Sequence, residues 1–322
     1  EVKFLMDTKR SFNLYVIHGG TNFGYTAGAN SGGKGYEPDV TSYDYDAPIN
    51  EQGAATPKYQ ALRQLIGSYL PKGKKLPAIP APIPVISIPE FNLVPFTSVW
   101  DHLPQPVKSP QPKPFEAYGQ DYGFMLYKTT LIGRKSGKLS VKDLHDYATI
   151  FLNGKYIGKI DRRLGEKTID IPASDVKDPV LEILVEGMGR INFAEALIDR
   201  KGITDRVVLN GMTLMNWEVY GLPMTEKFVQ DLTASSNNAH KPGQFFKATF
   251  NLDKPGDTYI DMSAYKKGIV WVNGHNLGRY WEIGPQQHLY CPAPWLKKGA
   301  NEIVVFDLHQ ETAEPVKGVE SL

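Results

Sequence analysis

The sequence lacks four features that would mark particular classes of protein. One cysteine in 322 residues cannot form an internal disulfide. The seven histidines are scattered, with no His-x-x-His or Cys-x-x-Cys arrangement, so the sequence predicts no zinc site. No apolar run approaches the roughly 18 residues of a membrane-spanning helix. A Gly-x-Ser-x-Gly elbow is also absent, which excludes a serine hydrolase of the common type.

An excess of one charge is missing as well. Lys and Arg number 36 against 35 Asp and Glu, a net charge of +1, and no basic block stands out. We therefore expect no nucleic-acid partner and no membrane partner. The chain starts at Glu1, without an initiator Met or a recognisable signal peptide, so we expect a processed or trimmed start. The compartment stays unknown, with a secreted or periplasmic location as the working expectation.

The first 70 residues predict one βα unit. Residues 12–17 are apolar and β-branched, which favours a strand buried on both faces. Residues 21–50 show no period and predict a long loop. Thr56 and Pro57 then predict a helix start. A complete barrel needs roughly 250 residues. Either this unit docks onto a part absent from the chain, or the barrel interpretation is wrong.

Residues 71–114 hold twelve of the 24 prolines, which predicts an extended, stiff connector. The stretch is too apolar for a free linker. We expect it to run along other domains and to add edge strands to their sheets.

From residue 115 the pattern is all β, and it contains an internal repeat. Residues 151–159 (FLNGKYIGK) match residues 271–279 (WVNGHNLGR) at an offset of 120. Each copy carries Asn-Gly between apolar runs, the signature of a two-residue hairpin turn. Cys291 aligns with Ile171 inside a strand, which predicts a buried small hydrophobe. We assign two β-sandwiches, residues 115–220 and 221–322.

Acidic and aromatic residues alternate between the predicted strand and helix. Asp39, Asp44 and Asp46 could ligate a hard cation, but the interleaved Tyr43 and Tyr45 favour hydrogen bonding to sugar hydroxyls and packing on a sugar ring. Asp44 and Asp46 point the same way about 7 Å apart on an extended segment. They would not flank a glycosidic bond as a catalytic pair does. We predict no metal here.

Several long stretches resemble family-35 glycoside hydrolases, the retaining β-galactosidases, and the match extends over nearly the whole chain. The stretches are residues 15–24 (YVIHGGTNFG), 41–48 (TSYDYDAP), 56–63 (TPKYQALR), 184–192 (LVEGMGRIN), 272–281 (VNGHNLGRYW) and 284–287 (GPQQ).

The resemblance implies a catalytic (β/α)₈ TIM barrel followed by jelly-roll domains similar to galactose-binding modules. This chain would then be mostly β: the terminal βα unit of the barrel and two jelly-roll sandwiches. In the family, two catalytic glutamates lie on earlier barrel strands, and neither motif has a match here. We therefore name no catalytic residue, expect no cofactor, and expect the chain alone to be inactive. Its partner would be the N-terminal barrel portion of the same enzyme.

The resemblance also implies substrate-binding positions. Tyr15 and Tyr45 correspond to tyrosines that contact the galactosyl unit, and Tyr45 would lie near the nucleophile. Asn22 and Asn192 complete the predicted set. Asn192 belongs to a loop resembling one that reaches the pocket rim, where this chain has Phe193-Ala194 in place of the family's frequent Tyr-Gly.

The sequence thus predicts the C-terminal segment of a retaining exo-β-galactosidase that acts on β-galactosides. The alternative is a non-catalytic carbohydrate-binding protein built from the two sandwiches, and a purely structural role for both sandwiches is a third reading.

Overall fold

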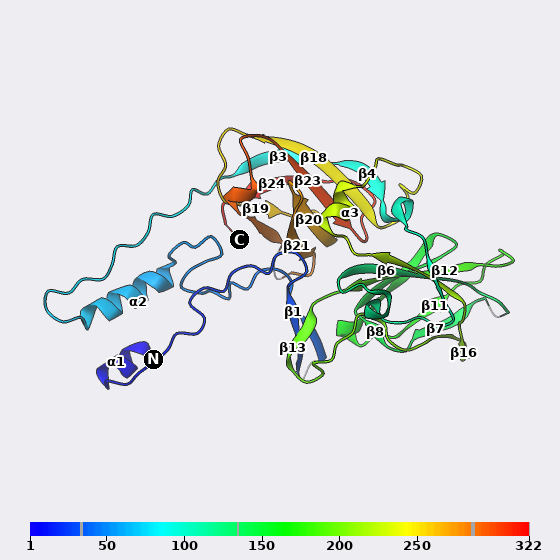
Figure 1. Cartoon of the computed structure of the whole chain (residues 1–322), viewed down its shortest axis with the longest axis horizontal. Helices are drawn as coiled ribbons and strands as arrows, with labels where there is room; N and C mark the ends of the chain where they lie inside the picture. Colours follow the sequence, from blue (N-terminus) through cyan, green and yellow to red (C-terminus); the bar gives the residue numbers. More distant parts are fainter. Residues whose placement is uncertain (33–34, 134, 285–286, 322) are drawn as a thin grey trace.

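Two β-sandwiches pack face to face and form most of the structure, while the N-terminal segment extends away from them (Figure 1). The computed structural model describes residues 1–32, 35–133, 135–284 and 287–321. The prediction of a mostly β chain is confirmed. Helices are few: α1 (Val2–Asp7), α2 (Pro57–Ser68), α3 (Glu226–Gln230) and the 3₁₀ turns η1 (Val99–His102), η2 (Phe115–Tyr118), η3 (Arg162–Leu164) and η4 (Ala293–Trp295).

The first sandwich encloses a core of apolar side chains such as Met125, Ile150 and Leu139. Its larger sheet has the order β10 (Lys155–Asp161), β9 (Tyr147–Leu152), β12 (Val180–Gly187), β6 (Gly123–Thr130), β17 (Trp217–Leu222), β5 (Val107–Ser109). The smaller sheet has the order β11 (Thr168–Ile171), β7 (Gly137–Val141), β15 (Val207–Leu209), β16 (Met212–Thr213), and β8 (Leu144–His145) pairs with β14 (Gly202–Ile203).

The second sandwich repeats this plan around a core that includes Phe246, Val270 and Ile260. Its larger sheet has the order β21 (His275–Trp281), β20 (Lys267–Val272), β23 (Gly299–Asp307), β18 (Gln244–Leu252), β4 (Val94–Ser98). The smaller sheet has the order β22 (His288–Cys291), β19 (Thr258–Asp261), β24 (Pro315–Val319), β3 (Ile88–Asn92). Cys291 is buried at the end of β22, as predicted.

The proline-rich stretch supplies edge strands, as its composition predicts. β3, β4 and β5 each lie at the end of a sheet order, where a strand needs partners on one side only. Pro89 and Pro95 fall within β3 and β4, and an edge position tolerates a residue that cannot donate a backbone hydrogen bond. One extended connector therefore contributes to both sandwiches.

The internal repeat is confirmed at the hairpins. Asn153 and Asn273 have φ of 50°, and the glycine after each also has positive φ, as a type I′ turn requires. Both hairpins carry a bulge just after the turn, ending at Gly158 and Gly278. The ungapped offset does not extend to the next strand: Leu152 faces Leu181, whereas Val272 faces Ile303. The equivalent positions there are 122 apart, a shift of two that keeps every side chain on its face.

The larger sheets of the two sandwiches pack on each other through a third core. Phe124 of β6 meets Phe306 of β23 edge to face at 5.1 Å, and Tyr147 of β9 meets Trp281 of β21 at 5.6 Å. Alternation along each strand explains the arrangement: on β6, Phe124 and Leu126 face this shared core while Met125 and Tyr127 face the first sandwich's own core.

An ion cluster is buried in the same interface. Glu186 of β12 lies 2.6 Å from Lys267 Nζ and 3.3 Å from Arg279 Nε, and all three side chains are about 2% exposed. Arg279 also donates to the Gly187 carbonyl at 2.9 Å. Burial lowers the pKa of Lys267, and the nearby Glu186 charge opposes that effect. One carboxylate from the first sandwich thus pairs with two cations from the second.

The N-terminal segment differs from its sequence-based prediction in two places. The strand predicted at residues 12–17 is wrong for this structure, because no described strand lies beside that stretch to accept its hydrogen bonds. The loop predicted at residues 21–50 contains β1 (Gly28–Gly32) and β2 (Gly35–Pro38), with residues 33 and 34 outside the described part. β1 pairs with β2 in a local antiparallel hairpin and, on its other edge, pairs in parallel with the distant β13 (Arg190–Ala194), a pairing that leaves no local pattern.

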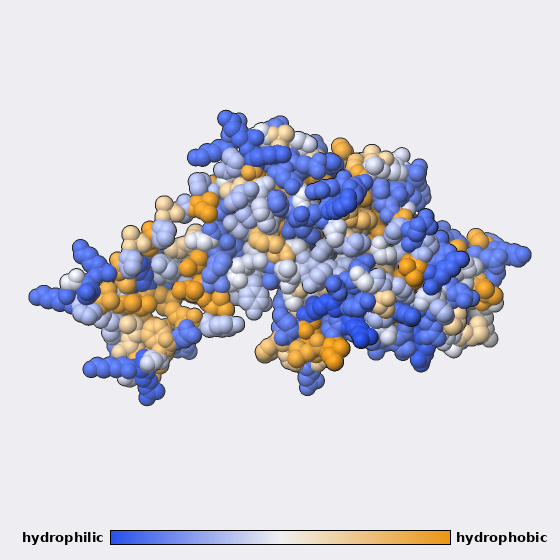
Figure 2. All heavy atoms as spheres, in the orientation of Figure 1, coloured by the Kyte–Doolittle hydropathy of each residue, from blue (hydrophilic) through white to orange (hydrophobic). Residues whose placement is uncertain are grey.

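The predicted helix start is confirmed. Pro57 opens α2, and the Thr56 hydroxyl accepts the Tyr59 amide at 3.3 Å. Neither α1 nor α2 buries a residue, and apolar side chains gather on the surface of this part of the molecule (Figure 2). The barrel that would cover them is not seen in the described chain. No described helix is both long and apolar enough to cross a membrane.

Replacing Glu186 with Gln should lower the free energy of unfolding by about 3 kcal/mol, because it leaves buried cations without a counter-charge. The matched control is Glu302→Gln, which breaks the half-exposed pair with Lys247 at 2.7 Å and should cost less than about 1 kcal/mol. Urea unfolding followed by tryptophan fluorescence measures both. Equal losses in the two variants would contradict a stabilising role for the buried cluster.

Candidate functional site

A glycine turn brings the two predicted tyrosines to one side of the molecule. The Gly20 carbonyl accepts the Tyr43 amide at 2.9 Å, and the Asn22 amide donates to the Thr41 carbonyl at 2.8 Å. A Cβ on Gly19 would lie only 1.7 Å from the Tyr43 carbonyl oxygen, so no other residue fits there without moving the backbone. The 18–24 turn and the 41–46 segment therefore run side by side.

Tyr15 and Tyr45 line the same hollow, of about 560 Å³, together with Lys58 and Leu62 of α2. Both tyrosines are strongly exposed, Tyr15 to 93% and Tyr45 to 75%. Tyr43 meets the Tyr45 ring edge to face at 4.8 Å and limits where that ring can lie. Two phenols on one wall with open space before them can offer ring faces and hydrogen bonds to a sugar.

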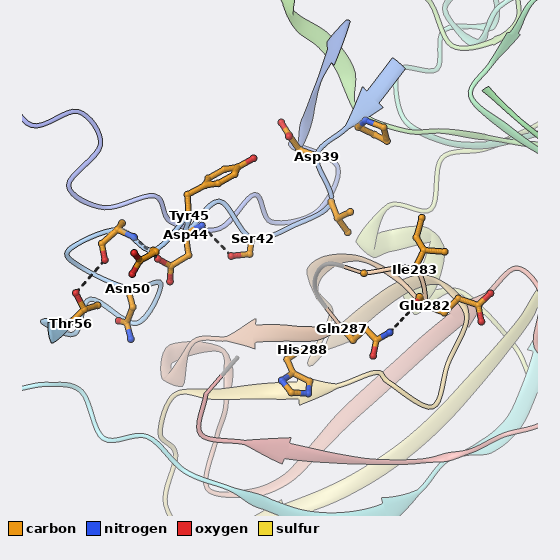
Figure 3. Close-up of a pocket in the computed structure, with 15 residues that line it drawn as sticks. Asp39, Ser42, Asp44, Tyr45, Asn50, Thr56, Glu282, Ile283, Gln287 and His288 are labelled. Atoms are coloured by element: carbon orange, nitrogen blue, oxygen red, sulfur yellow. Dashed lines mark hydrogen bonds between the residues drawn. The ribbon is translucent and has the colours of Figure 1, made fainter. Parts of the chain in front are cut away.

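Tyr45 also borders a second, larger hollow of about 1140 Å³. Asp39, Asp44 and Asn50 form the near wall, and Glu282, Gln287 and His288 of the second sandwich form the far wall (Figure 3). The far wall was not predicted. The only signal for it was the resemblance at residues 284–287, of which Pro285 and Gln286 lie outside the described residues.

The acidic residues of the loop are engaged in holding its shape. Asp44 accepts the amides of Ala47 and Glu51, each at 3.3 Å, and so organises the turn. Asp46 pairs with Lys58 at 2.5 Å. These contacts agree with the prediction that the two carboxylates do not form a catalytic pair.

Buried and half-buried groups of the loop have shifted pKa values. Burial raises the pKa of Glu51, whose carboxylate accepts the Thr21 hydroxyl at 2.8 Å. Burial also raises the pKa of Asp39. Partial desolvation, with the charges of Asp39 and Tyr43 adding to it, raises the pKa of Tyr45. The Tyr45 phenol therefore stays protonated near neutral pH and can donate a hydrogen bond.

The carboxylates that border the larger hollow do not converge. Asp39 and Asp44 come from one loop and Glu282 from the second sandwich, and their side chains point in different directions (Figure 3). A retaining glycosidase needs its two carboxyl groups about 5–5.5 Å apart, on either side of the scissile bond. The described residues around this hollow offer hydrogen-bonding and aromatic groups, but no two of their carboxylates are arranged as such a catalytic pair.

The other two predicted positions lie elsewhere. Asn22 and Asn192 line neither of these hollows. Asn192 occupies the bulge where β13 pairs with β1, and a Cβ on Gly28 would lie 2.6 Å from its Nδ2. Its neighbour Phe193 is 69% exposed. The structure thus places Tyr15 and Tyr45 on one hollow that neither asparagine lines.

One described group has the geometry to hold a metal ion. His145, Asp146 and Asp199 have ligand atoms within 4.8 Å of one another. Lys201 Nζ, however, lies 2.7 Å from both carboxylates, and Arg162 lies 2.6 Å from Asp146 and 2.8 Å from Asp199. These cations already neutralise the carboxylates. The group is better explained as a buried ion network, and it supports no metal site.

Comparisons with known proteins match three parts of the chain to models of one enzyme family. Residues 1–69 match "Glycosyl hydrolases family 35", residues 112–223 match "Beta-galactosidase, first all-beta domain", and residues 244–301 match "Beta-galactosidase, galactose-binding domain". By these matches the chain is similar to glycosyl hydrolase family 35 and to β-galactosidase domains. The family-35 segment is the one that carries Tyr15 and Tyr45, and the two β models fall on the two sandwiches.

Curated relatives extend the match along the chain. A β-galactosidase of Xanthomonas manihotis is 38% identical over 296 residues, which covers 90% of this chain and 48% of that protein. The human β-galactosidase-1-like protein 2 is 38% identical over 322 residues, covering 95% and 49%. β-Galactosidase 17 of Arabidopsis thaliana is 34% identical, covering 94% and 48%. The chain spans about half the length of these relatives.

The glycine turn predicts a local effect of substitution. Gly19→Ala should push the Tyr43 carbonyl away and speed hydrogen exchange at the Asn22 and Tyr43 amides, which cross between the two segments. Gly32→Ala is the control, because a Cβ there meets nothing within 4 Å. Exchange measured by NMR or mass spectrometry reads the effect. Unchanged exchange in Gly19→Ala would show that the turn does not hold the two segments together.

Proposed function

We propose that the chain is the C-terminal half of a retaining exo-β-galactosidase and supplies one wall of its galactose pocket. The observation that carries the proposal is a coincidence of two features on residues 1–69. This segment matches family 35, and it bears two exposed tyrosines on one hollow beside apolar side chains that the chain leaves uncovered.

The uncovered apolar surface fits a barrel partner. Phe4, Phe12 and Val16 are exposed to 59%, 38% and 39%, and α2 keeps its apolar stripe unburied. In the intact enzyme, residues 12–17 would find neighbouring strands and become the last strand of the barrel, and α2 would pack on its outside. The proposed units are residues 1–70, 71–114, 115–220 and 221–322.

The chemistry then divides between the halves. The two catalytic carboxylates reside in the N-terminal half, one protonating the glycosidic oxygen and the other forming and releasing the galactosyl-enzyme. Tyr45, protonated at neutral pH, donates a hydrogen bond that orients the nucleophilic carboxylate and lowers its pKa. Tyr15 packs on the galactosyl unit. Asn22 and Asn192 remain proposed substrate contacts, made once the halves dock, and no cofactor is needed.

This chain, purified without any other polypeptide, should not hydrolyse a chromogenic β-galactoside above the rate of a buffer blank. The proposal places both reacting carboxylates outside it, and neither phenol can replace them. A steady-state assay at about neutral pH, with a commercial β-galactosidase as positive control, measures the rate. Turnover that follows the chain through purification would contradict the proposal. Sugar binding by a stable chain without turnover in any context would favour the non-catalytic alternative.

In the intact enzyme, Tyr45→Phe should lower kcat by about tenfold to a hundredfold, the effect of losing one hydrogen bond to a charged group. Tyr43→Phe, two residues away on the same loop, should stay within about threefold of the parent. Melting temperatures of both variants separate catalysis from stability. If Tyr45→Phe keeps the parent kcat, Tyr45 does not act on the nucleophile.

A further inference from the structure

A separate hollow of about 520 Å³ lies where the N-terminal segment meets both sandwiches. Its walls come from Tyr25, from residues 118–122, from residues 223–226 and from Asn276. None of these residues lines the two hollows around Tyr45. From its aromatic and polar lining we infer that this groove binds a neutral pyranose unit of a glycan chain.

Two tyrosines form a platform in the groove. The rings of Tyr25 and Tyr122 are nearly parallel, at 12°, with centroids 6.0 Å apart, the separation of an offset-stacked pair. Tyr122 is 46% exposed, so part of its ring remains open to a ligand. An open aromatic face packs well on the C–H side of a pyranose ring because both surfaces are apolar and flat.

The platform is held in place before any ligand arrives. The Tyr25 hydroxyl donates to the Met224 carbonyl at 3.1 Å, which fixes that ring. Arg190 donates to the carbonyl of Asp121 at 2.6 Å and is itself paired with Glu116 at 2.6 Å. The backbone that carries Tyr122 is therefore clamped, so that little side-chain or loop entropy is lost on binding.

Polar groups surround the platform. Asp121, Glu226 and Asn276 line the same hollow and offer carboxylate and amide groups to sugar hydroxyls. The buried Gln120 amide instead donates to the Tyr122 and Phe124 carbonyls, each at 2.7 Å, and holds this wall. Gly119, in the left-handed region at φ 73°, has nothing within 4 Å of its Cβ position and leaves room at the wall.

Charge selects among ligand classes. The lining residues, all within the described part of the chain, include two carboxylates and no Lys, Arg or His, which disfavours phosphates, sulfates and uronic acids. A cationic ligand is disfavoured too, because Arg279 and Arg190 already lie 5.0 and 5.8 Å from the Tyr25 and Tyr122 ring centroids. The acidic lining disfavours anions and the nearby arginines disfavour cations, so a neutral polyhydroxylated ring is the ligand class that remains.

Glycan binding in this groove is independent of the proposed catalysis, because it needs neither the reacting carboxylates nor the barrel. The full 322-residue chain is titrated calorimetrically with β-1,4-galactotetraose. Saturable binding is expected, and Tyr122→Ala should weaken it by about tenfold or more. Tyr122→Phe, which keeps the ring face, should bind within about twofold of the parent.

Two controls define what would overturn the inference. Tyr69→Ala removes an exposed tyrosine just after α2 and should leave binding unchanged, and tetramethylammonium chloride should not compete. The inference fails if galactotetraose does not bind at about 10 mM, if Tyr122→Ala binds as the parent does, or if tetramethylammonium displaces the sugar. Loss of binding in Tyr45→Ala with Tyr122→Ala unaffected would instead assign the sugar to the wall near α2.

Discussion

The buried contact of Glu186 with Lys267 and Arg279 fixes the geometry on which both proposed binding surfaces depend. Arg279 extends the contact beyond the sandwiches: its carbonyl accepts the buried Thr41 hydroxyl at 2.6 Å, and its guanidinium lies against the Tyr25 ring. The backbone carbonyl of Arg279 therefore anchors the segment leading to Tyr45, and its side chain supports the aromatic groove. A buried ion cluster adds little net stability over apolar packing, so its value here lies in the single orientation that it imposes.

The N-terminal segment, in contrast, is fixed in its central part and left unburied at both ends. Its central part is held where β1, paired with β2, also pairs with β13, and where the Tyr36 hydroxyl donates to the Gly189 carbonyl at 2.7 Å. Its ends, α1 and α2, bury nothing. The chain buries the interface between its two sandwiches but leaves the apolar side chains of α1 and α2 unburied. A partner that covers these side chains is the best explanation of the difference. The matched relatives, twice as long, contain enough additional chain to provide it.

The sequence predicted well what short-range patterns encode. The Asn-Gly hairpins, the Thr56 cap and the placement of Cys291 follow from a few neighbouring residues and are confirmed. It failed where partners are distant: β1 pairs with β13, which lies far along the chain, and residues 12–17 lack the neighbours that a strand needs. For the same reason the far wall with Glu282 and His288 could not be foreseen. The local hairpin of β1 and β2 was missed as well. Tyr15 and Tyr45 came from the resemblance; the structure places them on one hollow, and their contact with substrate stays a prediction.

The central claim is that this chain is one half of a sugar-cleaving enzyme whose reacting carboxylates lie in the other half. Sequencing the coding DNA immediately upstream of the codon for Glu1 tests it most directly. The account predicts an open reading frame that continues in phase for about as many residues as this chain has, with alternating strand and helix patterns and a glutamate at the end of each of two strands. A start codon or an unrelated domain directly before Glu1 would contradict it.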